Sequence, residues 1–241
     1  MQSSLYVALS AQVSLEKRLD SIANNVANLG TVGFRADGVK FESLISRTAS
    51  DPVAFASSGA HYISRQSGAF VETGNLLDVA VRGEGCTAFE SPDGIVYSRD
   101  GRLEMTEAGD LLSVSGLPVL DVGGAPILLN PDAGPPRIAE DGMIMQNGQQ
   151  IGAIGLFAIP SDAALSRYGQ SAVRVEEPVE PVLDFTGNGL QQGFVEKSNV
   201  NPVLEMTRLI AITRAFDSVS ASIGEAENAL KEAIRILSSN R

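Results

Sequence analysis

The two ends of the chain share one pattern, in which apolar residues recur at alternating spacings of three and four. In the N-terminal stretch the positions in this register are Leu5, Ala8, Gln12, Leu15, Leu19, Ile22, Val26 and Leu29. This spacing is typical of a narrow apolar seam on an amphipathic helix. It predicts a helix over about residues 3–29. We expect Gly30 to take the left-handed position that ends this helix, and Gly33 to prevent its restart.

The C-terminal stretch predicts a second and longer helix. Its seam positions are Met206, Leu209, Thr213, Phe216, Ser220, Ile223, Glu227, Leu230, Ile234 and Leu237. Pro202 is tolerated in a first turn, Asn201 before it is a predicted N-cap, and Glu205 favours the positive end of the helix dipole. The helix is expected to span about 36 residues, or roughly 54 Å at 1.5 Å per residue.

Between these stretches the pattern changes to short runs of β-branched or alternating apolar residues. Turn sequences such as "SPDG", "RDG", "EAGD" and "NG" separate the runs, which predicts an all-β unit over about 76–190. Residues 31–72 are small and polar with weak periodicity, and we expect an extended linker or loop there. The predicted organisation is therefore an N-terminal helix (1–30), a linker (31–72), a β-rich outer domain (73–194) and a C-terminal helix (195–241). This is an α+β fold with a central all-β domain flanked by long helices that pack as a coiled coil.

The charge is uneven along the chain. The formal net charge is −11, and residues 72–184 contain 18 acidic and 6 basic side chains. No basic footprint for nucleic acid and no polybasic lipid-binding stretch is present. No apolar run is long enough for a transmembrane helix, and the N-terminus lacks the pattern of a cleaved secretory signal. We therefore expect no nucleic-acid partner, no membrane insertion and no cleaved signal peptide.

Motifs for catalysis or metal binding are weak. The single cysteine and single histidine, Cys86 and His61, cannot form a disulfide or a Cys/His zinc site. Gly83 and Gly85 lack the third glycine of a dinucleotide loop, and Ser14 with Lys17 matches a Ser-x-x-Lys pattern only in isolation. We expect no enzymatic activity, no catalytic or metal site and no cofactor.

Three blocks of sequence carry a resemblance to a known family. "IANNVANLGTVGFRADGVKF" (22–41) resembles the N-terminal signature of the bacterial flagellar rod and hook proteins, with "LGTVGF" as a mild departure. "TGNLLDVAVRGEG" (73–85) and "YSRDGRLEMTEAGDLLSVSGLPVL" (97–120) are similar to the start of the family's β-domain, although Cys86 and Thr87 stand where the family has an aromatic pair. "VEKSNVNPVLEMTRLIAITRAFD" (195–217) is similar to the C-terminal signature. The chain length is most similar to the proximal-rod members, and the distal-rod members are the runner-up.

The resemblance implies a structural role in motility. Proteins of this family leave the cell as unfolded chains through the flagellar type III export apparatus. They then polymerise with copies of themselves and with other rod proteins into a helical tube in the periplasmic span of the basal body. This tube transmits torque from the motor to the hook. The terminal helices line the inside of the tube as a coiled coil, and the β-domains form the outer layer. An acidic outer surface would follow.

The seams and the resemblance together predict an assembly interface. Each seam needs something to pack against, which is either the other helix of the same chain or a helix of another copy. We hypothesise that the amides of Asn24, Asn25 and Asn28 contact neighbouring subunits; the alternative is that they contact only water. The expected interface residues are Leu15, Leu19, Ile22, Asn24, Asn25, Val26, Asn28, Leu29, Gly33, Phe34, Ser198, Asn199, Asn201, Glu205, Met206, Leu209, Thr213, Arg214, Phe216, Ile223, Leu230, Ile234 and Leu237. A self-contained β-domain that binds a ligand is the other class of protein, but it would not need heptad termini.

Overall fold

The computed structural model describes residues 2–40, 43–46, 53–56 and 59–239. The chain divides into two compact units. The helical unit comprises Met1–Ala27, Asp37–Tyr62 and Asn201–Arg241, and the β unit comprises Asn28–Ala36 and Ile63–Val200. The fold is therefore a β-rich body with one long helix near each end of the sequence, as the patterns of the two termini and the middle predict.

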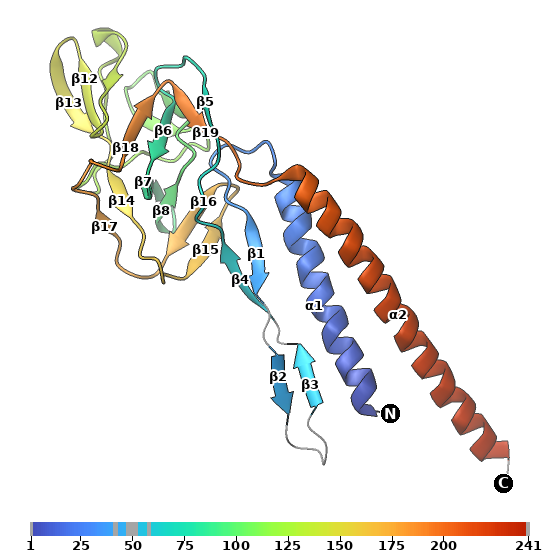
Figure 1. The fold of residues 1–241 in the computed structure, drawn as a ribbon. Coiled ribbons are helices and arrows are strands. Elements are labelled where there is room, and N and C mark those ends of the chain that lie inside the picture. Colours follow the sequence, from blue (N-terminus) through green and yellow to red (C-terminus); the bar gives the residue numbers. More distant parts are fainter. Residues whose placement is uncertain (1, 41–42, 47–52, 57–58, 240–241) are drawn as a thin grey trace. The chain divides into compact units, whose positions relative to one another are not determined.

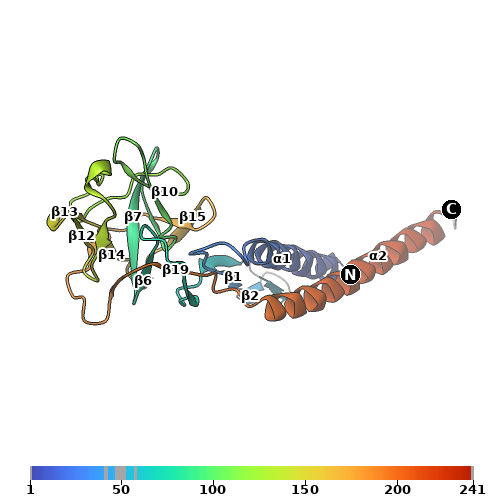
Figure 2. The same cartoon turned by 90° about the horizontal axis from the view of Figure 1, so that it is seen from above.

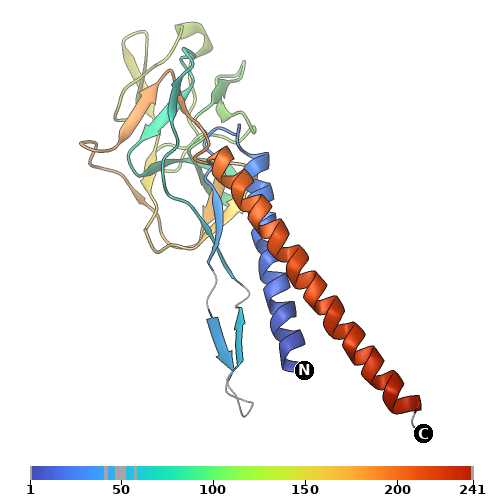
Figure 3. The same ribbon diagram turned by 45° about the vertical axis from the view of Figure 1, so that its right-hand side comes forward.

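The helical unit contains both long helices. Helix α1 spans Gln2–Ala27 and helix α2 spans Pro202–Ser239. They pack against each other and run side by side in Figures 1 and 3. Helix α2 is 38 residues long and α1 is 26, so α2 extends well beyond the length that α1 can cover.

The predicted N-cap of α2 is confirmed, whereas the predicted end of α1 is wrong. The amide N–H of Leu204 donates to Oδ1 of Asn201 at 3.1 Å, which confirms Asn201 as the N-cap of α2. The expectation for Gly30 is wrong, because the left-handed glycine after α1 is Gly33, with φ +68°. Helix α1 instead ends in a turn in which Thr31 donates its amide N–H to the carbonyl of Asn28 at 3.2 Å.

The segment 31–72 contains strands, although its sequence predicts an extended linker. The strands are β1 (Asp37–Lys40), β2 (Ser43–Ser46), β3 (Val53–Ala56), β4 (Ala60–Ile63) and β5 (Phe70–Glu72). β1 pairs with β4, β2 pairs with β3, and β5 pairs with the distant strand β19 (Phe194–Glu196). Within the helical unit, β1 and β3 contact α1. Backbone pairing forms these strands, within the segment for β1 to β4 and with a distant strand for β5. Such pairing leaves little local periodicity to detect in the sequence.

The β unit is built around a six-stranded sheet in the order β15-β16-β8-β7-β14-β17. Figure 2 labels three of these strands, β7, β14 and β15. Its strands and those of the smaller sheets are β6 (Val79–Arg82), β7 (Gly85–Ser91), β8 (Gly94–Ser98), β9 (Leu103–Met105), β10 (Leu111–Ser113), β11 (Arg137–Ile138), β12 (Met143–Gln146), β13 (Gln149–Ala153), β14 (Leu156–Ala158), β15 (Leu165–Tyr168), β16 (Ala172–Val175), β17 (Glu180–Pro181) and β18 (Gly189–Gln192), with a 3₁₀ turn at Pro131–Ala133. The described pairs in these sheets are antiparallel.

Two clusters of buried side chains form the core of the β unit. The larger cluster includes Val81, Phe89, Ile144 and Leu156, and the smaller one includes Tyr97 and Phe157. The rings of Tyr97 and Phe157 meet edge to face, with centroids 5.8 Å apart. This core lies within the β unit, so the unit carries the apolar burial that an independently stable domain requires.

Candidate assembly surface

Apolar side chains on the two helices are exposed in the helical unit. On α2, Val203 is 73% exposed and Ile210 is 56% exposed. On α1, Tyr6, Leu9 and Val13 are also exposed. Large apolar side chains gathered on helices are unusual on a surface that meets only water, and they mark contact sites for other proteins. We call these exposed apolar residues of α1 and α2 the helix strip.

The predicted seams behave differently on the two helices. On α1, Ile22 is buried, and Leu15, Leu19 and Val26 are partly buried. On α2, the seam residues Met206, Leu209 and Thr213 are exposed, and so is Arg214, which follows Thr213. The seam residues Phe216 and Ile223 are partly buried. Leu230, Ile234 and Leu237 lie in α2, but the structure does not describe their side chains. The α1 seam is thus largely used within the chain, while much of the α2 seam remains available.

The asparagine amides at the end of α1 are used inside the helical unit. Asn25 is buried; its Nδ2 donates to the carbonyl of Asp37 at 2.9 Å, and its Oδ1 accepts from the amide N–H of Asp37 at 2.8 Å. Asn24 donates to Oδ2 of Asp37, and the hydroxyl of Ser21 donates to the Asp37 carbonyl at 3.0 Å. These side chains fix the first residue of β1 against α1, a role within the chain that the sequence did not indicate.

The other expected interface residues near the N-terminal signature, Asn28, Leu29, Gly33 and Phe34, lie in the β unit. Oδ1 of Asn28 accepts from the hydroxyl of Thr31 at 3.0 Å, and Leu29 is partly buried. At Gly33 an added Cβ would lie 2.2 Å from the backbone nitrogen of Asp100, so only glycine fits this close approach. Phe34 is fully buried, and the guanidinium of Arg167 lies 4.4 Å from the centre of its ring.

Asn199 connects three strands or loops of the β unit. Its Oδ1 accepts from the amide N–H of Ala36 at 2.7 Å, and its Nδ2 donates to Oγ of Ser64 at 3.1 Å and to the carbonyl of Gln66 at 2.8 Å. Ser198 accepts from the amide N–H of Val200 at 3.3 Å. The side-chain amide of Asn199 therefore connects the segment after α1 to the segment before α2.

A buried ion cluster lies beside Asn199 in the same unit. The carboxylate of Glu196 is inaccessible to solvent and pairs with Arg35 at 3.0 Å and with Arg99 at 2.8 Å. It also accepts from the amide N–H of Gly68 at 2.8 Å. Desolvation by burial, followed by repulsion from Arg99, lowers the pKa of Arg35, and the charge of Glu196 opposes that shift.

The sequence gives little warning of this cluster. Arg35 belongs to the N-terminal signature, but Glu196 and Arg99 were not among the expected site residues. A charged residue inside an apolar run, as in "FVEKS" or "VYSRD", was the available signal. In the C-terminal signature, Glu205 is also buried, and its Oε1 accepts from Arg208 at 2.7 Å.

The environment of Cys86 does not favour nucleophilic chemistry. Desolvation by burial raises the pKa of the Cys86 thiol, although Arg99 and Arg35 oppose the shift. A raised pKa disfavours the reactive thiolate. Within the described residues, no group of three or more His, Cys, Asp or Glu side chains is arranged to hold a metal ion. No described helix is both long and apolar enough to cross a membrane.

Comparison with known proteins gives this surface its context. A family model described as "Flagella basal body rod protein" matches residues 5–35, and one described as "Flagellar basal body rod FlgEFG protein C-terminal" matches residues 191–236. These two matches cover the helices and the segments that adjoin them. With the full-length relatives named below, these matches show that the chain belongs to the flagellar basal-body rod protein family, whose members are structural and not enzymatic.

Within that family the similarity is strongest to proteins named FlgF among the relatives compared. The chain is 52% identical to the flagellar basal-body rod protein FlgF of Mesorhizobium japonicum over 99% of both chains. It is 45% identical to FlgF of Rhizobium meliloti over the full length of both. The identity to the rod protein FlgG of Bacillus subtilis is 29%, over 98% of this chain and 99% of that protein. The chain is thus a structural rod subunit of the bacterial flagellar basal body.

Proposed function

We propose that this subunit polymerises through its two helices into the tubular proximal rod, which transmits torque from the motor to the hook. The observation that carries this proposal is the helix strip, because α2 leaves apolar residues such as Val203, Met206 and Ile210 exposed. Helices from other copies of the chain and from other rod proteins would cover these residues. Burial of apolar surface is the dominant favourable term in such association.

The proposal includes the layout of the rod. The helices of residues 1–30 and 195–241 form the inner coiled coil, and the β-rich domain of residues 73–194 forms the outer layer in the periplasm. The acidic residues between 72 and 184 then face outward. The chain reaches this place unfolded, through the type III export apparatus and without a cleaved signal peptide.

The expected interface residues fall into two groups under this proposal. The exposed seam residues of α2, with the C-terminal seam positions Leu230, Ile234 and Leu237, contact other subunits directly. The buried and partly buried residues, such as Ile22, Asn25, Phe34 and Asn199, set the positions of the helices and of the segments that join them. The partly buried side chain of Asn24 contributes polar contacts at the edge of the interface between subunits.

A substitution on the helix strip tests the proposal. Ile210→Asp places a charge on an exposed apolar position of α2, and Leu183→Asp makes the same kind of change at an 82% exposed position of the β unit. We expect both purified chains to retain the circular dichroism spectrum of the unchanged protein. In cells, Ile210→Asp should abolish rod assembly and swimming, whereas Leu183→Asp should retain both. Normal basal bodies and swimming with Ile210→Asp would refute the assembly role of the strip.

The distal rod is the second candidate, and the full-length similarity to FlgG of Bacillus subtilis favours it. Complementation separates the two positions. The gene for this chain should restore motility to a strain of its own species that lacks the FlgF-like protein and not to one that lacks the FlgG-like protein. The reverse result would place the chain in the distal rod.

A further inference from the structure

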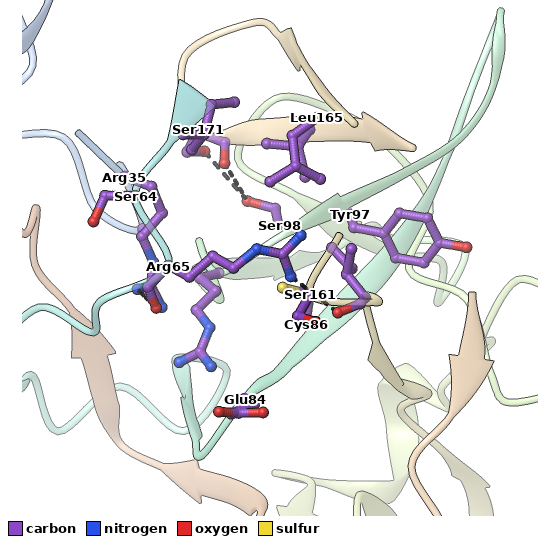
Figure 4. Close-up of a pocket in the computed structure, with 15 residues that line it drawn as sticks. Arg35, Ser64, Arg65, Glu84, Cys86, Tyr97, Ser98, Ser161, Leu165 and Ser171 are labelled. Carbon is purple, nitrogen blue, oxygen red and sulfur yellow. Dashed lines mark hydrogen bonds between the residues drawn. The ribbon is translucent and has the colours of Figure 1, made fainter. Parts of the chain in front are cut away.

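A cavity of about 170 Å³ lies in the β unit beside the buried ion cluster. Figure 4 shows Arg35, Ser98, Cys86 and Ser161 among the side chains around it. Arg99 also lines it, and Arg65, Glu84 and Ser161 are exposed. The exposed residues form a rim through which a small molecule or a side chain can enter.

The charges at the base of this cavity do not balance. Arg35 and Arg99 are both buried, and both pair with the single carboxylate of Glu196. Burial without a compensating charge is costly, because desolvation penalises each ion. At the rim, the exposed side chains of Arg65 and Glu84 carry opposite formal charges. One buried positive charge therefore remains beside the cavity.

Hydroxyl groups add hydrogen-bond capacity on the polar side of the cavity. The Ser98 hydroxyl donates to the carbonyl of Ser171 at 3.3 Å, and the Ser98 and Ser171 hydroxyl oxygens are 3.4 Å apart. Among the residues that the structure describes, the Ser161 side chain has no hydrogen-bond partner, so its hydroxyl is free to donate to an incoming acceptor. Anionic oxygens form strong, charge-assisted hydrogen bonds with such donors and with guanidinium groups.

Part of the cavity wall is apolar. It is formed by Ile63, Ile159, Leu165 and Val173, of which Ile63 and Val173 belong to the smaller core cluster. A bare inorganic anion would leave this wall uncovered. A carboxylate on a short apolar stem would satisfy both sides, since its charge faces the arginines and its methylene groups face the aliphatic wall.

From these features we infer that this cavity is a binding site for a carboxylate carried on a short aliphatic stem. Such a group occurs in free short-chain carboxylates and in the Asp and Glu side chains of a neighbouring subunit. The bound carboxylate compensates the charge that Arg35 and Arg99 leave unbalanced. The site is separate from the helix strip, and its existence does not depend on the proposed assembly.

Thermal unfolding of the purified full chain tests the site. Sodium propionate and sodium acetate are compared with sodium chloride at pH 7 and constant ionic strength. Because a ligand that binds only the folded state raises its stability, the midpoint should rise by about 5 °C at ten times the dissociation constant and continue to rise with the logarithm of the ligand concentration. Chloride should produce no such rise. An identical response to all three salts would overturn the inference.

Two variants locate the effect. Ser161→Phe places a ring at the rim of the cavity, and the propionate-dependent rise should disappear. Ser115→Phe is the matched control, because Ser115 is exposed and lines a different cavity; the rise should remain. Arg35→Met leaves the balanced pair of Arg99 and Glu196, and it should also lose the rise. An unchanged rise in Ser161→Phe would show that the carboxylate binds elsewhere.

A cellular comparison identifies the source of the carboxylate. If a neighbouring subunit inserts an acidic side chain, Ser161→Phe should reduce swarm diameter at least twofold, whereas Ser115→Phe should not. If the ligand is a free carboxylate, both variants should swim normally while Ser161→Phe still lacks the propionate response in vitro.

Discussion

Replacing Glu196 by glutamine removes the one carboxylate that two buried arginines share. Glutamine has nearly the same shape, so the packing around position 196 changes little. The hydrogen bond from the amide N–H of Gly68 can persist, because the glutamine carbonyl is also an acceptor. The variant therefore isolates the loss of the negative charge opposite Arg35 and Arg99.

The expected cost follows from the burial of the cluster. Removing one partner of a buried ion pair typically costs about 3–5 kcal/mol, because the remaining charge stays buried and uncompensated. Here two arginines lose their partner, but glutamine retains its polarity, so we expect about 3 kcal/mol. The β unit spans roughly 150 residues, and for that size the midpoint of thermal unfolding should fall by about 10 °C.

The assay is urea and thermal unfolding of the purified protein, followed by circular dichroism. Glu140→Gln is the matched control, because Glu140 pairs with Arg82 at 3.0 Å while the two side chains are 76% and 49% exposed. An exposed pair contributes about 0–1 kcal/mol, so this control should remain close to the unchanged protein. If Glu196→Gln costs no more than Glu140→Gln, the buried cluster does not hold the β unit together.

Three further predictions concern single positions. Gly33→Ala should destabilise the β unit by about 2 kcal/mol or more, because φ is +68° and the added Cβ would meet backbone at 2.2 Å. Gly30→Ala, whose Cβ would meet nothing within 4 Å, should leave the urea midpoint unchanged or slightly higher; equal losses at both positions would contradict the geometry. Asn25→Ala should cost about 1–3 kcal/mol, because the amide N–H of Asp37 loses its partner while the Asp37 carbonyl keeps only Ser21. Hydrogen exchange at the Asp37 amide should accelerate, and unchanged exchange would rule this out. Because burial raises the pKa of Cys86, the thiol should react with iodoacetamide more slowly than a free thiol at pH 8. As the pH rises, the unfolded state loses the Cys86 thiol proton before the folded state does. The contribution of Cys86 to stability is therefore present below the ordinary thiol pKa of 9.0 and declines as the pH rises above that value. A Cys86→Ala variant whose stability declines in the same way at alkaline pH would refute this link.

The asparagine cluster shows how far the sequence leads at one site. The sequence pattern places the asparagines on a helix, just before glycines that end it. The same pattern resembles the signature of a family of proteins that assemble into a rod. The partner of Asn25 was not visible, because Asp37 acts through its backbone, which any residue offers equally. Side chains that bind backbone groups leave no complementary residue type to find in a sequence.

The ion cluster presents the same limit over longer distances. Arg35, Arg99 and Glu196 are separated from one another by roughly 60 to 160 residues. The local sequence around each of them predicts only the end of a strand or a turn. Their convergence depends on the pairing of β5 with β19 and on the sheet that carries β8. Strand β5 was missed for the same reason, since its partner β19 lies far along the chain. Strands β1 to β4 pair within residues 31–72 and were missed because their sequences are short and weakly periodic.

The two helices, the N-cap at Asn201, the run of short strands between the helices and the membership of the rod family all follow from the amino-acid sequence. These features rest on interactions between residues a few positions apart, or on motifs that are contiguous in the chain. The folded chain was needed to show which seam residues remain exposed, why Gly33 and not Gly30 must be glycine, and how one carboxylate pairs with two arginines. Each of these depends on contacts between distant segments, and such contacts arise only when the chain is folded.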